Sequence, residues 1–226
     1  MILGLRWTAS HADARLAKMA DEYLLNEAAH QGGNRRLVRR PPPSVANKLA
    51  RSAWEIVRML LFRPTPAPLH AWRRFILRSF GARIGHRVAV YPSALIWAPW
   101  NLAIDAGATI GGGAIIYNVD HITVGRYAVI SQGAHLCTAS HDHDSAGFEL
   151  VTAPIHIEEN AWVAAEAFVG PGVTISKAAV VGARAVVVRS VDERAIVVGN
   201  PAKVIRQRPI EGRNRLQGRA PSGSQD

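Results

Sequence analysis

The sequence predicts an all-β solenoid preceded by helices, and the main reason is a repeat of six residues. From residue 84 onward, aliphatic residues recur at every sixth position in four runs. Two extra residues separate the first three runs, and a longer insertion precedes the fourth. This period fits neither the two-residue alternation of an amphipathic strand nor the 3.6-residue turn of a helix, and it is typical of a solenoid. The members are Ile84, Val90 and Ile96; Ile104, Ile110 and Ile116; Val124, Ile130 and Leu136; and Ile157, Val163, Val169, Ile175, Val181 and Val187.

Each six-residue unit is long enough for one short strand and one corner, so three units close a triangular coil. Stacked coils then pair their strands in parallel and collect the aliphatic residues in a central column. The next residue is often glycine, as in Ile110-Gly111 and Val124-Gly125. We attribute this preference to tight turning of the chain at the corners. We expect about five coils.

Composition and charge limit the classes of partner. The 226 residues include 27 Lys and Arg against 17 Asp and Glu, a formal net charge of +10. Such an excess can indicate nucleic acid, an anionic membrane or a polyanionic ligand. The basic residues concentrate in residues 35–40, 48–83 and 203–219, outside the repeats, so nucleic acid is not expected. A single cysteine, Cys137, cannot form an intramolecular disulfide, which favours a cytoplasmic protein.

The residues before the repeats predict two basic helices after a weakly ordered leader. Residues 1–43 form the leader, within which a helix from Ala12 to Ala29 is conceivable. One helix is expected to start at Ser44 as its N-cap and to end before Pro64, and a second to run from Leu69 to Phe80. Amphipathic helices with basic and aromatic residues often lie on membrane surfaces, but these two could instead pack on the solenoid and cap it.

The insertion between Leu136 and Ile157 is the candidate functional loop. It opens with the sequence Thr-Ala-Ser-His-Asp-His-Asp at residues 138–144. Insertions are tolerated on the surface of a solenoid, and such loops commonly form its binding face.

Several longer motifs make the chain similar to a known family. They are Pro99-Trp100-Asn101-Leu102, Ile130-Ser131-Gln132-Gly133-Ala134, the stretch from Leu136 to Asp142, Ala161-Trp162-Val163-Ala164, and the stretch from Gly199 to Arg206. With them the chain resembles the hexapeptide-repeat acetyltransferases, particularly those of colanic acid and other exopolysaccharide biosynthesis, and the maltose and galactoside O-acetyltransferases. The resemblance spans roughly residues 47–206. It implies a left-handed parallel β-helix, a homotrimer with active sites at subunit contacts, and transfer of acetyl from acetyl-CoA to a sugar hydroxyl.

The resemblance also implies the catalytic base, which would be His141. A sugar hydroxyl is a poor nucleophile until a base removes its proton, and an imidazole that titrates near neutrality suits this task. Asp142 and His143, and by a looser match Asn118, are the expected acceptor-binding residues. Cys137 lies beside a core position of the repeat, so direct transfer is expected rather than an acyl-enzyme.

For acetyl-CoA, the resemblance implies two groups of residues. Trp162, Ala164 and Ala165 would line the acetyl-pantetheine channel, with Gly182 and Ala183 one coil further along. Lys203 and Arg206 would contact the phosphates, with which cationic side chains pair well.

Two alternatives come from other classes of protein. The cluster of His141, Asp142, His143 and Asp144 could hold a metal, and the related gamma-class carbonic anhydrases bind zinc through three histidines, two of them five residues apart. No pair of histidines here has that spacing, so no metal is expected. The second alternative is a non-catalytic scaffold that binds a membrane or partners through the basic helices.

The sequence therefore predicts a leader (1–43), a basic helical segment (44–83), a β-helix acyltransferase domain (84–206) and a disordered tail (207–226). The expected partners are acetyl-CoA, a sugar acceptor and further copies of the chain. The expected location is the cytoplasm, with the inner face of the membrane as a candidate contact for the basic helices. Which sugar is acetylated, and whether on oxygen or nitrogen, stays open.

Overall fold

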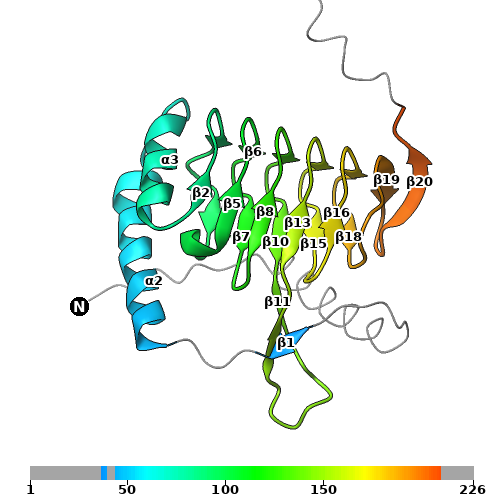
Figure 1. The fold of residues 1–226 in the computed structure, drawn as a ribbon, viewed down its shortest axis with the longest axis horizontal. Coiled ribbons are helices and arrows are strands. Elements are labelled where there is room, and N and C mark those ends of the chain that lie inside the picture. Colours follow the sequence, from blue (N-terminus) through cyan, green and yellow to red (C-terminus); the bar gives the residue numbers. More distant parts are fainter. Residues whose placement is uncertain (1–36, 40–43, 210–226) are drawn as a thin grey trace, which may run out of the picture.

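The computed structural model describes residues 37–39 and 44–209, and in this part of the chain the predicted β-helix is confirmed. Short strands wind in successive coils and pair in parallel with the strands of neighbouring coils (Figure 1). We name the three sheets by their order within a coil. The first sheet has the order β2-β5-β8-β13-β16, the second β3-β6-β9-β14-β17-β19-β20, and the third β4-β7-β10-β15-β18. Five coils supply a strand to every sheet, and β19 begins a sixth.

The elements are short and regular in length. The helices are α2 (Val45–Val57), η1 (Arg58–Phe62), α3 (His70–Ser79) and η2 (Pro99–Asn101). The strands are β1 (Val38–Arg39), β2 (Arg83–Ile84), β3 (Ala89–Val90), β4 (Leu95–Ile96), β5 (Leu102–Ile104), β6 (Thr109–Ile110), β7 (Ile115–Tyr117), β8 (Ile122–Val124), β9 (Val129–Ile130), β10 (His135–Cys137), β11 (Ala139–His141), β12 (Leu150–Thr152), β13 (Ile155–Ile157), β14 (Trp162–Val163), β15 (Phe168–Val169), β16 (Thr174–Ile175), β17 (Val180–Val181), β18 (Val186–Val187), β19 (Ala195–Val198) and β20 (Lys203–Gln207).

The aliphatic residues of the repeat form the central column that the sequence predicted. All fifteen are buried, the most exposed being Ile84 at 8%. Burying one such side chain contributes about 1.5–3 kcal/mol relative to leaving it in water. The column is therefore the main source of stability along the solenoid.

The glycines after the aliphatic positions have a different cause from the one expected. A Cβ atom on Gly111 would lie 2.7 Å from the backbone nitrogen of Gln132 in the next coil, and one on Gly125 equally close to that of Glu159. Neither glycine has a positive φ. The left-handed conformation falls elsewhere in the corners, for example at Tyr127 with φ 55°. Close stacking of the coils, and not the turn itself, requires these glycines.

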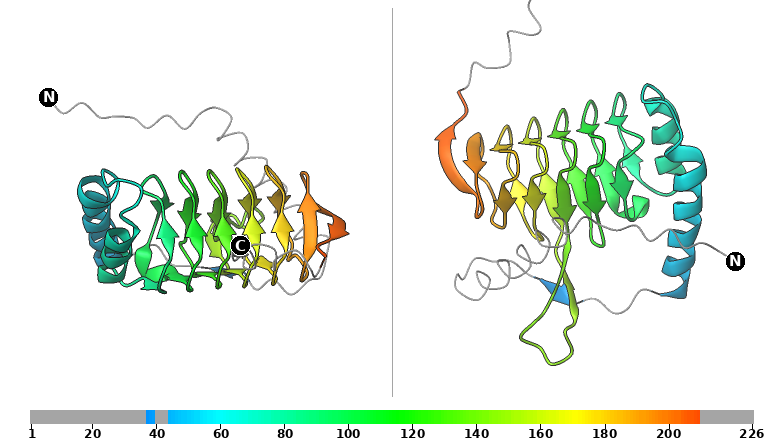
Figure 2. Two further views of the ribbon diagram at one scale, coloured as in Figure 1. Left: turned by 90° about the horizontal axis from the view of Figure 1, so that it is seen from above. Right: turned by 180° about the vertical axis from the view of Figure 1, so that it is seen from behind.

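The two predicted helices lie across the first coil and close that end of the solenoid (Figures 1 and 2). Ser44 caps α2 as expected, because its hydroxyl accepts a hydrogen bond of 3.2 Å from the amide of Asn47. Trp54, Phe62 and Leu77 are buried against the coil. Trp54 also donates through Nε1 to the carbonyl of Ile96 at 2.7 Å. The helices are thus a cap, as one of the two alternatives predicted.

A buried arginine fastens the cap to the solenoid. The guanidinium of Arg73 is fully buried and donates to the carbonyls of Val90 at 2.6 Å and Pro66 at 2.9 Å, and to the hydroxyl of Thr65 at 2.7 Å. Burial lowers the pKa of Arg73 from its usual value. The proline-rich connection between the helices is thereby held against the first coil.

The leader contributes one strand that the sequence analysis did not anticipate. Strand β1 pairs antiparallel with β12, and Val38 lies opposite Thr152. Residues 1–36 and 40–43 of the expected leader, including the suggested helix from Ala12 to Ala29, lie outside the described residues, as does the chain from residue 210. The expected tail begins within β20. Of the helices described, none is both long and apolar enough to cross a bilayer.

Candidate active site

The insertion after β10 forms a hairpin that projects from the solenoid (Figure 1). Strands β11 and β12 pair antiparallel, with His141 opposite Leu150, and the chain then returns to the first sheet at β13. The amide of Asp142 donates to the carbonyl of Glu149 at 2.9 Å and extends the pairing toward the tip. Strand β1 adds a third strand. We call the segment from residue 139 to 152 the active-site hairpin.

His141 is exposed near the tip, and its ring orientation is fixed by Phe148. The Nδ1 atom lies 2.9 Å from the carbonyl oxygen of Phe148, and the two rings stack with centroids 4.6 Å apart and 7° between their planes. A carbonyl oxygen only accepts hydrogen bonds, so Nδ1 carries the hydrogen in the neutral ring. The lone pair is then on Nε2, the atom that can accept a proton.

Buried polar groups hold the root of the hairpin. The hydroxyl of Thr138 accepts from the amide of Asp120 at 2.9 Å and donates to the carbonyl of Tyr117 at 3.1 Å. The hydroxyl of Thr152 donates to the Asp120 carboxylate at 2.9 Å. Both threonines are fully buried. A buried polar group is costly to leave without a hydrogen bond. This network therefore favours a single conformation of the hairpin root.

Asp142 and His143 lie beside His141 on the hairpin, but neither orients its ring. Asp142 pairs with Arg39 at 3.0 Å, and Arg39 is also 3.8 Å from Glu149. The Nε2 atom of His143 lies 3.5 Å from the carboxylate of Asp144. Both residues are placed where they could meet an acceptor near the tip.

Asn118 is at the same corner of the solenoid one coil earlier, and it is fully buried. Its Oδ1 atom accepts from the amide of Ala98 at 3.0 Å, and its Nδ2 atom donates to the carbonyl of the same residue at 2.6 Å. The side chain thus holds the two-residue insertion before β5 in place. An acceptor contact through this side chain has no support in its geometry.

The residues expected to bind acetyl-CoA are brought together along one corner of the solenoid. This corner lies between the second and third sheets, and its coils are joined by hydrogen bonds from Glu166 N to Gln132 O at 3.0 Å and from Arg184 N to Ala165 O at 2.9 Å. We call it the corner row. Exposed residues of the row include Trp162, whose Nε1 donates to the hydroxyl of Ser131 at 2.9 Å. The row contains Trp162, Ala164 and Ala165 in one coil and Gly182 and Ala183 in the next.

Lys203 and Arg206 stand at the end of the row. Both are exposed on β20, which pairs antiparallel with β19, and Lys203 lies opposite Val198. Cationic side chains in this place suit the phosphates of a ligand that follows the row.

One chain does not bring the hairpin and the corner row into contact. His141 follows β10, whereas Ala165 precedes β15, the neighbour of β10 in the third sheet. In the register of these strands Ala165 is level with Gln132, so the whole of β10 and the start of the hairpin lie between it and His141. The hairpin and the corner row thus lie at opposite edges of the third sheet.

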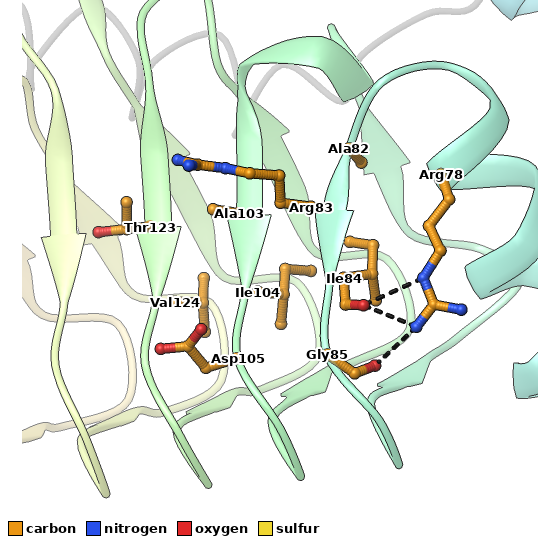
Figure 3. A pocket seen from close by; sticks show the side chains of 10 residues that line it. All are labelled: Arg78, Ala82, Arg83, Ile84, Gly85, Ala103, Ile104, Asp105, Thr123 and Val124. Carbon is orange, nitrogen blue, oxygen red and sulfur yellow. Dashed lines mark hydrogen bonds between the residues drawn. The ribbon is translucent and has the colours of Figure 1, made fainter.

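A pocket elsewhere on the molecule contains none of these residues (Figure 3). It lies over the first three strands of the first sheet, beside α3, and its walls include Arg78, Arg83, Asp105 and Thr123. Arg78 is committed to the backbone there, since it donates to the carbonyl of Ile84 at 3.0 and 2.6 Å. The pocket belongs to the cap and not to the hairpin.

The metal alternative gains no support from residues 37–39 and 44–209. In them, no three His, Cys, Asp or Glu side chains come together as ligands for a metal ion. His86, His121 and His156 lie on different coils.

Sequence reasoning missed Phe148 and Arg39. Phe148 acts on His141 through its carbonyl, which every residue type has, and through its ring, but nothing in the local sequence indicates that this ring meets His141. Arg39 is 103 positions from Asp142, and nothing in its local sequence connects the two.

Comparison with known proteins agrees with this geometry. No family model matches the chain. A protein of Escherichia coli K12 named as a candidate colanic acid biosynthesis acetyltransferase, WcaF, is 43% identical over 162 residues, which are 72% of this chain and 89% of that protein.

Two solved structures share the fold. The hexapeptide-repeat acetyltransferase VCA0836 of Vibrio cholerae, complexed with acetyl-CoA, has a TM-score of 0.66 at 24% identity and covers 73% of this chain and 90% of its own. A maltose O-acetyltransferase of Clostridium difficile 630 has a TM-score of 0.67 at 23% identity, with 74% and 90% covered. Together with the likeness to WcaF, these matches and the coils built from six-residue repeats show that the chain belongs to the hexapeptide-repeat acetyltransferases and is an acyltransferase.

Proposed function

We propose that the protein transfers an acetyl group from acetyl-CoA to a sugar hydroxyl during assembly of an exopolysaccharide or capsule, with His141 as the general base. The observation that carries this proposal is the hydrogen bond between His141 Nδ1 and the carbonyl of Phe148. It leaves Nε2 as the basic atom at the exposed end of the ring, where an acceptor hydroxyl can approach.

The donor is inferred from the corner row and its likeness to a solved complex. The Vibrio cholerae acetyltransferase of the same fold was crystallised with acetyl-CoA. In this chain the small residues Ala164, Ala165 and Ala183 leave the row open for a narrow pantetheine arm. Lys203 and Arg206 supply positive charge for its phosphates.

The reaction is direct transfer within a ternary complex. Nε2 of His141 removes the hydroxyl proton while the acceptor oxygen attacks the thioester carbonyl. The tetrahedral oxyanion is stabilised by a backbone N–H group. As the carbon–sulfur bond breaks, the thiolate takes the proton from the imidazolium, so the products are the acetyl ester and free CoA.

Cys137 is not required in this mechanism. It is partly buried at the end of β10, and its thiol donates to the carbonyl of Ala139 at 3.1 Å. A thiol held this way at the hairpin root is poorly placed to attack a thioester on the corner row.

We further propose a homotrimer in the cytoplasm, where acetyl-CoA is available. Three copies arranged around an axis would bring each hairpin to the corner row of a neighbour, which one chain cannot do alone. The contacts of a three-fold ring are heterologous, so one flat face of each solenoid would meet a different face of its neighbour. The sugar class rests on the likeness to the E. coli protein named for colanic acid biosynthesis.

The test is CoA thiol release from acetyl-CoA with a panel of mono- and oligosaccharide acceptors. We expect acceptor-dependent release that falls by at least ~100-fold in His141→Ala, with little change in Cys137→Ala and, in His143→Ala, a higher KM for the acceptor with little change in the turnover number. Light scattering establishes that each variant keeps the oligomeric mass of the wild type. Release that persists in His141→Ala would contradict the base, and loss in Cys137→Ala with the oligomer intact would contradict direct transfer.

A further inference from the structure

The cap carries an apolar surface on the side facing away from the solenoid. Val45, Leu49 and Ile56 of α2 and Leu60 of η1 are between 59% and 72% exposed. Their spacing of four, seven and four residues places them along one side of a helix. Trp54, which is buried against the first coil, lies on the opposite side. A helix that was only a cap would be expected to turn polar residues outward.

Helix α3 extends this surface. Trp72 and Phe75 are exposed, and their rings stack with centroids 5.7 Å apart. The indole Nε1 of Trp72 donates to the carbonyl of Leu61 at 2.9 Å, which joins α3 to the end of η1. The six residues Val45, Leu49, Ile56, Leu60, Trp72 and Phe75 form what we call the outer cap surface. Contiguous exposed apolar residues of this kind mark an interaction site.

The segment that carries the outer cap surface has a net positive charge. Residues 44–83 contain eight basic residues and one acidic residue, Glu55. Glu55 is paired with Arg58 at 2.8 Å, and this hydrogen bond lowers its pKa, so both charges of the pair are satisfied.

The arginines of α3 face the solenoid and not this surface. Arg73, Arg74 and Arg78 donate to backbone carbonyls of the first coil, those of Val90, Val88 and Ile84. Lys48 and Arg63 are exposed beside the apolar side chains.

This charge decides between possible occupants. Two copies of the surface meeting face to face would bring like charges together, which is unfavourable at short range. An anionic lipid surface attracts the basic residues and accepts apolar side chains and a tryptophan at headgroup level.

We propose that the outer cap surface docks the protein on an anionic lipid bilayer, with α2 and α3 lying in the plane of the interface. The solenoid then stands away from the membrane, because the helices cross its end (Figures 1 and 2). This binding is independent of acetyl transfer, since none of the six residues lies on the active-site hairpin or the corner row.

The test is flotation of the full-length protein with vesicles of phosphatidylcholine alone and vesicles that also contain phosphatidylglycerol. We expect binding to the anionic vesicles only, weakened by high salt. The double variant Ile56→Glu and Leu60→Glu removes apolar contacts and adds repulsive charge, so binding should fall at least ~10-fold. Tyr127→Glu changes an aromatic residue that is 53% exposed on the body of the solenoid, and this variant should bind like the wild type.

Three results would overturn the proposal. The first is a wild-type protein that does not bind anionic vesicles. The second is a double variant that binds anionic vesicles as well as the wild type does. The third is a wild-type protein that binds neutral and anionic vesicles equally. If the double variant instead changes the oligomeric mass measured by light scattering while the wild type stays off vesicles, a second copy covers the surface. Transfer to a soluble acceptor should be unchanged in the double variant, so failure of this proposal is separable from failure of the proposed reaction.

Discussion

The guanidinium of Arg39 lies 3.0 Å from the carboxylate of Asp142 and thereby joins the strand before the cap to the hairpin that carries His141. It also lies 3.8 Å from Glu149, across the hairpin from Asp142. Strand β1 adds backbone pairing with β12. The hairpin is therefore held from both sides, by its buried root and by a distant segment of the chain.

Arg39→Ala should lower the turnover number about two- to fivefold and leave thermal stability nearly unchanged. Exposed ion pairs contribute only about 0–1 kcal/mol, so the hairpin loosens without unfolding. Arg39→Lys keeps the charge and should recover most of the rate. Steady-state kinetics check this, and a loss as large as that of His141→Ala would show that Arg39 does more than position the hairpin.

Gly111→Ala should destabilise the solenoid, whereas Gly112→Ala should have only a small effect on its stability. A Cβ atom at Gly111 meets backbone of the next coil, the carbonyl carbon of Ser131 at 2.8 Å, which cannot move without parting the coils. At Gly112 it meets only the Ser93 hydroxyl, which can rotate away. Overpacking costs about 1–3 kcal/mol, which lowers the thermal midpoint by about 2–12 °C. Equal thermal midpoints for the two variants would contradict the conclusion that close stacking of the coils requires Gly111.

Arg73→Met should lower the thermal midpoint by about 10 °C. The substitution removes a buried charged donor and leaves the carbonyls of Val90 and Pro66 without their hydrogen bonds to it. The free energy of unfolding should fall by about 3–5 kcal/mol. Arg74→Met is the matched control, because Arg74 is only partly buried and donates to one carbonyl, that of Val88. We expect Arg74→Met to lower the free energy of unfolding by about 1 kcal/mol. Equal midpoints for both variants would mean that Arg73 does not fasten the cap.

Lys203→Glu and Arg206→Glu should each raise the KM for acetyl-CoA about tenfold with little change in the turnover number. An ion pair with a phosphate is lost and replaced by repulsion, while the hairpin is untouched. Lys177→Glu alters an exposed lysine outside the corner row and serves as the control. If only the turnover number fell, these cations would not be holding the donor.

The solenoid was predictable because its period is unambiguous. Every aliphatic residue from Ile84 to Val187 in the six-residue frame is buried, since the coil repeats with the sequence and each unit makes the same contacts. Ser44 marked the start of α2 through its own side chain. The glycines were found but explained wrongly, because crowding between coils is a property of the stack and not of the local chain.

The active site was less accessible to sequence reasoning. His141 stood out by resemblance, but its tautomer depends on a backbone carbonyl in the hairpin. The outer cap surface shows the same limit. The sequence indicated an amphipathic helix after Ser44, and only the packing of Trp54 on the first coil established that the side with Val45, Leu49 and Ile56 faces outward.

The most direct measurement is acceptor-dependent CoA thiol release by His141→Asn compared with His143→Asn. Asparagine can still donate to the Phe148 carbonyl, so the first variant keeps that hydrogen bond while it removes the basic Nε2 atom with the rest of the ring. The account predicts that His141→Asn loses at least ~100-fold in turnover with an unchanged KM for acetyl-CoA, while His143→Asn stays within a few-fold of the wild type. Wild-type turnover by His141→Asn would contradict the assignment of the base.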